Sequence, residues 1–572
     1  MAYDNMVAPR TQGLNQRGQK AKKLGDKAFA DQAVFLPLWQ AQAEIFYPER
    51  ADFTMTYSAA DERYEGIYTI EPQLLRRDMA NNLGAMIRPR GRDWFRAAAR
   101  PDRIMEDDDA KRWCEQTSKT MRNIVYSPAA RFTKALGASD HDYVTFGHAV
   151  IAHPYNANQT GILFQCLHPR DCAYTRNAEG VVDTMYQKMK LSLRQMASMF
   201  GLERLPKEWR DRFTDHPEEK HTLMRCVLPV DESEYGPDER RIKSARFSAL
   251  YVACDTREEA TLGEGFFLSF PFTVREWMHI SGEDYARSPC TSVALADSRT
   301  LNVTQEALLS GIEMRVDPPK YYMAGAIEGP MELRAGGMTA IDDEYDLSKG
   351  DPIKSMEIGE PRYAMEFKRD LQETLGRAFF QNLLKLPEGE MTAYEVSERI
   401  EMYSREAAPI FEPMEAENAD LMNSVFERAM AKGAFGRVME DGMIEGLPES
   451  LQGADITFEF ETPLSDALKK MKVAQFDQVA QRVQALIATQ DTRAIAAIDN
   501  VDFDAALRDA FEGMAPADWL KRTEDRDAQR QADAEAAAQA EAEAQAMELG
   551  KTAANANPEN LRQVAQVMGE QA

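Results

Sequence analysis

The sequence has few cysteines and no long apolar run, and both absences restrict the kind of protein it encodes. Its 572 residues include six cysteines and no C-x-x-C pair, so we expect free thiols in a reducing compartment. No window approaches the roughly 18 to 20 apolar residues of a membrane span. The start, MAYDNMVAPRTQGLNQRGQKAKK, has no apolar signal-peptide core, so we expect a protein that folds in a cytoplasm.

Basic residues are also fewer than acidic ones. The chain carries 68 Lys and Arg against 94 Asp and Glu, a formal net charge of -26. An ordinary DNA-binding protein owes its affinity to Lys and Arg that neutralise phosphates, so this balance excludes that class. The deficit is uneven, because residues 1–100 carry 15 basic and 12 acidic side chains, whereas residues 401–572 carry 16 and 33. The acidity therefore belongs mainly to the C-terminal part, which does not exclude DNA that only passes nearby.

Common catalytic and metal-binding signatures are missing as well. There is no Walker A loop, no G-x-S-x-G, no H-E-x-x-H and no Cys/His spacing of a zinc module. His148 and His153 lie five apart in a β-like run, so they should point to opposite faces of a strand. Gly263-Glu264-Gly265 lacks the third glycine of a dinucleotide loop and predicts a hairpin turn. We therefore expect no enzyme activity, no cofactor and no catalytic or metal site.

What the sequence does contain predicts an α+β protein. Hydrophobic residues make up 44% of the chain, enough to bury large cores. Short β-rich runs bounded by Gly, Pro, Asn and Asp extend from about 143 to 275, interrupted by a helix-like insertion at 191–213. They predict an antiparallel β domain. A Gly-rich stretch at 318–365 predicts loops and a hairpin, and ITFEFETPLS at 456–465 predicts a strand.

The N-terminal part combines a polar segment with helical spacing. Residues 1–30 lack periodicity, which predicts a flexible arm with a basic cluster at Lys20, Lys22, Lys23 and Lys27. Helices are predicted at 72–87 and after the acidic cluster 106–109, which we interpret as a helix cap rather than a metal site.

Between these two helices, RPRGRDWFRAAARPDR interleaves arginines with Trp94 and Phe95. Such a segment is able to contact phosphate. The acidic residues nearby favour a subunit interface or a solvated surface.

The second half of the chain has the most regular helical patterns. Residues 291–316 predict a helix that Asp317-Pro318-Pro319 ends. In 366–384 the apolar residues recur every four positions, the pattern of one helix face; they are Phe367, Leu371, Leu375, Phe379 and Leu383.

A second long helix is predicted directly after that one. Thr392 and Glu395 form a capping box at the start of a helix over 392–432, in which Pro409 and Pro413 predict a kink or a break. Residues 524–548, rich in Ala, Gln, Glu and Asp, are either an exposed helix or disordered.

The order of these elements resembles the portal, or head-to-tail connector, proteins of short-tailed bacteriophages, over roughly residues 31–530. The resemblance is carried by DMANNLGAMIRPRGRDWFRAAA, by YVTFGHAVIAH and by PFTVREWMHISGEDYARSPCTSVALADSRTLNVTQEALLSGIEMRVDPP. The most specific segment is MTAYEVSERIEMYSREAAPIFEPMEAE, where Met-Thr-Ala-x-Glu-Val opens a long helix. No single string is sufficient, but the series in this order is typical of the family.

The resemblance implies a portal fold, with a helical stem and crown, a β-rich wing and clip, and a central channel in a ring oligomer. On that pattern the segments are a flexible arm at 1–30, wing at 31–190, wing and clip at 191–290, a stem helix at 291–317, wing loops and a hairpin at 318–365, a helix and tunnel loop at 366–391, crown and wing helices at 392–523, and an acidic tail at 524–572. The tunnel loop, which approaches DNA, would be formed by Lys385, Leu386, Pro387, Glu388, Gly389, Glu390 and Met391.

The same resemblance implies the partners and the location. The protein would form a dodecameric ring at one capsid vertex of the virion, assembled in the host cytoplasm, through which double-stranded viral DNA is packaged and later ejected. It would contact the terminase packaging motor, a tail adaptor protein, capsid and scaffold proteins and internal ejection proteins, and no membrane. Two alternatives stay open: a cytoplasmic enzyme of unrecognised class, and a non-viral helical scaffold protein, which would lack the β-rich middle.

Overall fold

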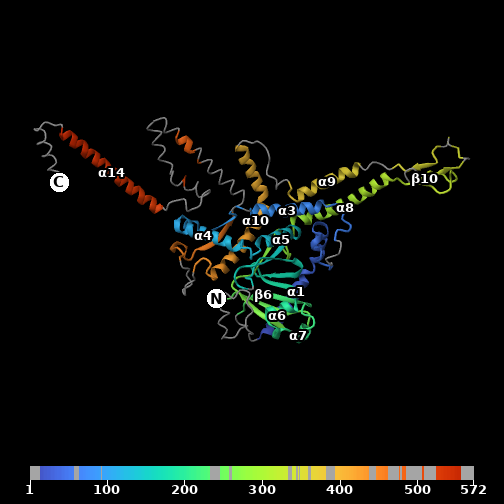
Figure 1. Ribbon diagram of the computed structural model, residues 1–572, viewed down its shortest axis with the longest axis horizontal. Helices are drawn as coiled ribbons and strands as arrows, with labels where there is room; N and C mark the ends of the chain where they lie inside the picture. Colours follow the sequence, from blue (N-terminus) through green and yellow to red (C-terminus); the bar gives the residue numbers. More distant parts are fainter. Residues whose placement is uncertain are drawn as a thin grey trace. The chain divides into compact units, whose positions relative to one another are not determined.

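The computed structural model describes most of the chain in separate stretches (Figure 1). These are residues 13–56, 63–89, 91, 93–156, 158–231, 245–256, 260–332, 338–342, 345–346, 348, 350–357, 362–381, 393–436, 446–460, 476, 479–484, 506–507 and 523–554. The chain divides into two units: Met1–Ala97, Thr117–Gly446 and Thr457–Ala467 form the first, and Ala98–Gln116, Leu447–Ile456 and Leu468–Ala572 the second.

A five-stranded antiparallel sheet forms the β-rich part of the first unit. Its strand order is β4-β5-β6-β7-β8, with β4 at Cys172–Arg176, β5 at Val182–Ser192, β6 at Lys220–Pro229, β7 at Phe247–Ala253 and β8 at Thr261–Phe267. A three-stranded sheet, β3-β2-β9, joins β2 (His148–Ala152) to β3 (Gln165–Leu167) and β9 (Phe272–Glu276). The antiparallel β domain expected between 143 and 275 is confirmed, except that residues 143–146 end a helix.

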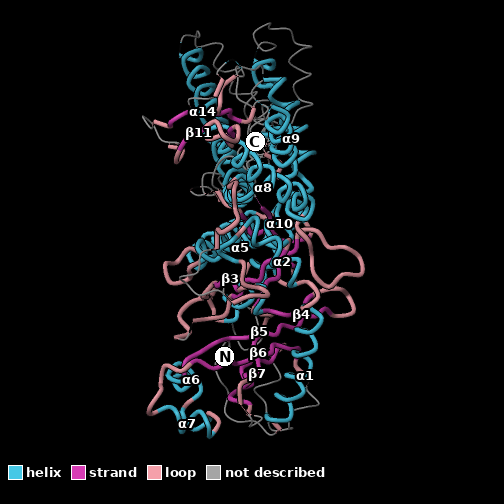
Figure 2. Tube along the Cα trace, turned by 90° about the vertical axis from the view of Figure 1, so that its right-hand side faces the viewer, coloured by secondary structure: helices cyan, strands magenta, loops and turns pink. Residues whose placement is uncertain are grey.

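Helix α1 (Leu14–Gln32) covers one face of the large sheet, so the flexible arm expected over 1–30 is wrong for the part from residue 14 onward. Figure 2 shows α1 alongside β4 to β7. Its contact face carries Gly18, Ala21, Gly25 and Ala28, and a Cβ at Gly18 would lie 1.9 Å from Thr261 Oγ1. The helix was missed because this seam consists of small residues, which leave no hydrophobic periodicity in the sequence.

Gly263-Glu264-Gly265 lies inside strand β8, so the hairpin turn expected there is also wrong. Glu264 points at α1, where the guanidinium of Arg17 donates to its carboxylate at 2.9 Å. Both side chains are buried. A buried carboxylate needs such a partner, and the partner comes from a helix 247 residues away in sequence.

The opposite face of the large sheet is covered by α2 (Leu36–Phe46) and by the predicted insertion, which forms α6 (Leu193–Phe200), a 3-10 turn at Leu202–Arg204 and α7 (Lys207–Phe213). Trp39, Phe200 and Trp209 pack here against Leu223 and Tyr251 in one apolar core. The helical insertion at 191–213 is confirmed, and both faces of the sheet are closed.

A helical layer adjoins the smaller sheet. It contains α3 (Glu71–Ile87), α5 (Phe132–Phe146), the N-terminal half of α8 (Pro289–Val316) and the end of α9 (Arg362–Ala378). Phe46, Leu83, Tyr143, Leu301 and Leu375 share its core. The predicted helices at 72–87 and 291–316 are confirmed, and the second ends at Asp317 as expected.

Helix α4 (Asp108–Val125) follows the acidic cluster, and Asp108 and Asp109 occupy its first turn, as a cap requires. The arginine-rich segment before it contains strand β1 (Phe95–Arg100), which the sequence did not predict. Trp94 and Phe95 are buried within the first unit, where Phe95 packs edge-on against Phe458 at 5.8 Å. The aromatic pair is therefore part of a core. The predicted strand at 456–465 is β14 (Asp455–Phe460).

The long helices largely follow their apolar patterns. In α9, Leu371 and Leu375 are buried, as is Phe379 directly after its end, but Phe367 is 48% exposed. The helix ends at Ala378 rather than 384, and Leu383 lies outside the described residues. Helix α10 (Ala393–Ala431) continues through Pro409 and Pro413, so the alternative of a break is wrong. Residues 524–548 form part of α14 (Thr523–Ala554), whose described side chains are almost all exposed, in accord with the helical alternative.

Candidate functional site

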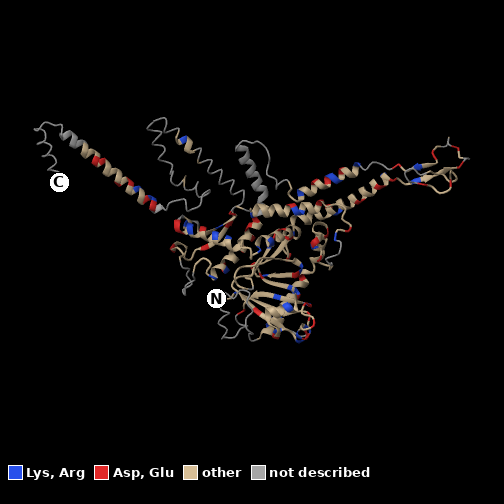
Figure 3. Ribbon diagram, viewed as in Figure 1, with Lys and Arg blue, Asp and Glu red and all other residues tan. Residues whose placement is uncertain are grey.

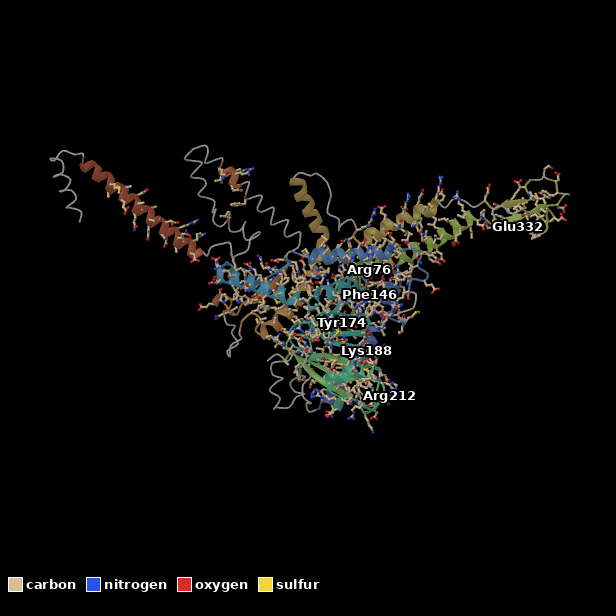
Figure 4. The ribbon with its side chains drawn as sticks, viewed as in Figure 1. Arg76, Phe146, Tyr174, Lys188, Arg212 and Glu332 are labelled. Atoms are coloured by element: carbon tan, nitrogen blue, oxygen red, sulfur yellow. The ribbon has the colours of Figure 1, made fainter. Side chains whose placement is uncertain are left out.

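Helices α8 and α9 extend from the first unit as a two-helix arm, seen side by side in Figures 1 and 2. At the end of the arm lie two small antiparallel sheets of two strands each. In one, β10 (Lys320–Tyr322) pairs with β13 (Ile353–Ser355), and in the other β11 (Ile327–Glu328) pairs with β12 (Ala340–Ile341). Figure 4 places Glu332 at this end and Arg76 at the body. Tyr321, Tyr322 and Met323 are exposed there, so the tip presents apolar surface.

The base of the arm is fixed rigidly to the body. Ser288 caps α8 by accepting from the Thr291 amide, and its hydroxyl donates to the Val144 carbonyl at 2.6 Å. Thr291 Oγ1 donates to the Thr145 carbonyl at 2.6 Å. Both carbonyls belong to the last turn of α5, where no intrahelical donor remains for them. The C-terminal end of α5 therefore positions the start of α8.

The expected tunnel loop, Lys385 to Met391, lies outside the described residues, as does Thr392 of the expected capping box. Glu395 lies in the first turn of α10, with its side chain outside the described part. The two flanks of the loop are described. Phe379 packs against Phe46 at 5.6 Å, and Ile410 and Met414 of α10 enter the same core. Phe379 therefore anchors the chain a few residues before the loop, whereas the contacts of α10 with this core lie well inside that helix.

A buried ion network connects the elements on which the loop and the arm are mounted. Asp140 of α5 binds two guanidiniums, accepting from Arg88 Nη2 through Oδ2 and from Arg275 Nη1 through Oδ1, the latter at 2.8 Å. Arg275 of β9 also faces Glu417 of α10, with Nε 3.5 Å from Oε2. No local pattern in the sequence indicates this network, because its contacting members are at least 52 residues apart and belong to no motif.

Glu417 is the titratable member of this network. Burial raises the pKa of Glu417 to about 8, against the opposing effect of Arg275. Its carboxylate also accepts from the backbone amide of Glu276, next to Arg275 on β9. A group that loses its proton near pH 8 and joins α10 to the sheet makes the stability of this junction depend on pH.

The buried side chains of the first unit include two histidines, His148 and His153, and two cysteines, Cys172 and Cys290. His148 packs against Trp39 with ring centroids 4.6 Å apart, and burial lowers its pKa to about 4. On the other side of β2, His153 Nε2 lies 2.9 Å from Thr273 Oγ1 and Nδ1 faces Arg428. In the described part of the chain, no three His, Cys, Asp or Glu side chains are grouped to hold a metal ion. Burial also raises the pKa of the Cys172 and Cys290 thiols, which disfavours reactive thiolates.

A pocket of about 400 Å³ lies between α3 and α5. Small residues line it, including Ala80, Gly84 and Gly137, and its polar floor is the Arg88 and Asp140 pair. The two charged groups of the pocket are therefore already paired with each other.

The described end of the chain is strongly acidic. Helix α14 carries eight acidic side chains against three basic ones, distributed along its length (Figure 3). None of the helices in the described part of the chain has the length and apolar character of a membrane span. This helix is able to repel other polyanions but has no apolar face of its own on which to pack.

A family model and two individual relatives point to the same protein family. A model of the family described as "Bacteriophage head to tail connecting protein" matches residues 18–517. The portal protein of Salmonella phage epsilon15 is 22% identical over 484 residues, 83% of this chain and 84% of its own. The probable portal protein of Bordetella phage BPP-1 is 22% identical over 469 residues, 78% of this chain and 79% of its own.

Solved structures with some likeness come from gene transfer agent particles. The neck of the native particle, computed with C12 symmetry, matches with a TM-score of 0.36 at 10% identity, covering 74% of this chain and 88% of that one. The virion of the native particle matches with a TM-score of 0.35 at 11% identity, again covering 74% and 88%.

Proposed function

The chain belongs to the family of bacteriophage head to tail connecting proteins, and from this membership we propose that its copies form a closed ring at one capsid vertex of the virion. Double-stranded viral DNA is packaged and later ejected through the channel of this ring. The observation that carries the proposal is the family match over residues 18–517. We assign the chain no catalytic activity, and the five-stranded sheet and the family both argue against a helical scaffold protein.

We assign the stem of the ring to the two-helix arm of α8 and α9, and the clip to the segment at its tip, residues 318–361. Strands occur in the arm only at that tip, and Tyr321, Tyr322 and Met323 are exposed there. The sequence-based expectation placed part of the clip within 191–290. Strands β6 to β8 of that segment lie in a sheet that helices cover on both faces, so we favour the arm tip as the surface for the packaging motor and the tail adaptor.

The tunnel loop proposed at Lys385 to Met391 joins the end of the stem to α10, and the helices after it, over 392–523, supply the crown and part of the wing. Phe379, directly after the end of α9, and Met414 of α10 belong to one core, so this core joins the two elements between which the loop lies. The crown and the acidic tail at 524–572 face the capsid interior, where scaffold, capsid and ejection proteins are met. Assembly takes place in the host cytoplasm.

The negative net charge of the chain suits a channel through which DNA slides better than a protein that binds DNA tightly. Each phosphate that a Lys or Arg neutralises adds a salt-dependent holding energy, so a densely basic channel would retain DNA instead of letting it slide. A chain with a net charge of -26 repels the DNA backbone and keeps it centred. In a ring this charge is multiplied by the number of copies.

Electron microscopy of the purified protein tests the ring directly. We expect negatively stained particles with rotational symmetry and a central hole, and a mass of many subunits by light scattering. A monomer or small oligomer without a hole, under all conditions that keep the chain folded, would refute the proposal.

Replacing Lys385 with Gln tests the tunnel loop. A few basic residues at a constriction make brief phosphate contacts that resist slippage, so we expect K385Q to assemble normal rings but to retain packaged DNA less well. The measurement is the length and retention of packaged DNA in particles assembled with the variant. Lys190, exposed on β5, gives the control K190Q, which should behave as wild type. Unchanged packaging and retention in K385Q would remove the loop from the proposed mechanism.

A further inference from the structure

Helix α8 exposes one uncharged stripe along almost its whole length. Seven exposed residues recur at alternating intervals of three and four; they are Val293, Ala296, Thr300, Val303, Ala307, Ser310 and Met314. None is charged, although charged residues make up 28% of the chain and are normally concentrated on exposed surface. We call this stripe the α8 seam.

The seam is distinct from the face by which α8 is buried in its own chain. That second face carries Ala294, Ser298, Leu301 and Leu308. Of the exposed charged residues of α8, Arg299, Glu306 and Glu313 follow one edge of the seam, and Arg315 lies beside the other edge near the end of the helix. Helix α8 therefore has uncharged residues on its buried face and along the seam, and its exposed charged residues lie between the two. This is the pattern of a helix that packs on two sides.

The spacing and the size of the side chains restrict what covers the seam. An alternation of three and four is the period of helix-on-helix packing with knobs in holes. Ala296, Ala307 and Ser310 are small, so they form shallow holes that accept large knobs. On α9, Tyr363 is 87% exposed and Phe367 48% exposed. These two residues, one turn apart, form what we call the α9 edge.

We propose that the α8 seam of one copy packs against the α9 edge of a second copy. This inference rests on the ring proposed above: a ring of identical copies repeats one contact between two different faces, and the arm offers a small-residue face on α8 and a large-residue edge on α9. Pairing of Lys320 with Ser355 brings the chain back at the tip, so the end of α8 and the start of α9 lie at the same level of the arm. A neighbour related by rotation about the ring axis therefore presents Tyr363 and Phe367 near Ala307 and Met314.

Replacing Val303 with Lys tests the seam. Val303 is 63% exposed in the single chain, so the monomer loses no core contact, and Lys is a better helix former than Val. In the assembled ring the ammonium would be buried without a partner. We expect the protein concentration needed for half-assembly to rise at least about tenfold, measured by light scattering and native mass spectrometry. The circular dichroism spectrum and melting temperature of the monomer should stay unchanged.

A matched control is Val181→Lys. Val181 is 58% exposed in the turn between β4 and β5. The substitution there makes the same change from Val to Lys at similar exposure, but away from the arm. V181K should assemble as wild type. Equal assembly of V303K and wild type would overturn the proposed seam while leaving the ring intact, whereas a wild-type chain that never forms rings would overturn the ring itself.

Cysteine crosslinking identifies the covering element. The double variant A307C/F367C, treated with a short bis-maleimide, should give a ladder of dimers, trimers and higher species, because each copy is linked through two different faces. A307C alone should stay uncrosslinked, and wild type reports the background from its own thiols. Dimers from A307C alone would mean that α8 packs on α8, and the absence of a ladder from the double variant would mean that α9 is not the partner. Either result contradicts the proposal.

Discussion

Replacing Gly147 with alanine should prevent the chain from folding to a soluble product. Gly147 follows α5 and leads into β2 with φ at 80°, in the left-handed region that disfavours side chains. A Cβ there would lie 1.9 Å from the carbonyl carbon of Arg287 and 2.1 Å from the Ser288 amide nitrogen. These are backbone atoms of the segment that caps α8, so no rotamer change relieves the overlap. We expect a loss above about 4 kcal/mol, a large part of the stability of a typical domain.

The measurement compares two glycines near opposite ends of the same helix. Gly137 lies inside α5 with no heavy atom within 4 Å of where its Cβ would be. Gly137→Ala should therefore stabilise the protein by about 0.5 to 1 kcal/mol, because alanine loses less backbone entropy in a helix. The soluble yield and the melting temperature of both variants, compared with wild type, measure the two effects. A soluble G147A with a melting temperature near wild type would show that Arg287 and Ser288 are free to move away, contrary to the tight junction described above.

The Gly147 junction also shows why part of this fold was predictable and part was not. The helix at 291–316 and its end at Asp317-Pro318-Pro319 follow from local periodicity and from the backbone limits of proline, so sequence alone predicts them. The close approach of Gly147 to Arg287 depends on two segments 140 residues apart. Nothing local at either position indicates it.

Errors at the N-terminus have a related physical cause. Helix α1 buries Gly18, Ala21, Gly25 and Ala28 against the sheet and pairs Arg17 with Glu264. Large apolar residues at helical spacing are the usual sign of a buried helix face, and this face has glycine and alanine instead. These small residues let the helix backbone approach the sheet closely. The Gly263-Glu264-Gly265 segment was misread for the same reason, since its glycines accompany close packing within a strand.

The candidate site was predicted unevenly. The resemblance places the tunnel loop at Lys385 to Met391, which lie outside the described residues, so this placement stays a prediction. The network of Asp140, Arg275 and Glu417 was not predicted. Each residue is one of 94 acidic or 68 basic side chains, and only the tertiary fold selects these three.

Replacing Asp140 with asparagine should destabilise the first unit by about 3 to 5 kcal/mol, the usual cost of removing one partner from a buried ion pair. The two oxygens of Asp140 serve Arg88 and Arg275, both buried. An amide offers one acceptor and places an N–H group against the second guanidinium, which leaves a buried charge unbalanced. Chemical denaturation at pH 7 measures the loss. Asp78→Asn, on the exposed face of α3 beside Arg77, is the control and should change stability by less than about 0.5 kcal/mol.

Glu417→Gln separates the charge of this network from its packing. The pKa of Glu417 in the folded chain, about 8, is above its ordinary value of 4.5, so its contribution to stability is full below pH 4.5 and is lost as the pH rises through 8. Wild type should therefore lose stability progressively between about pH 4.5 and 8, with a slope of up to about 1.4 kcal/mol per pH unit, and no further above that range. E417Q should remove that part of the slope and be at least as stable as wild type at pH 9. If the slope is unchanged in E417Q, Glu417 is already ionised at neutral pH, and Asp140 and Glu417 then balance Arg88 and Arg275 as two full ion pairs.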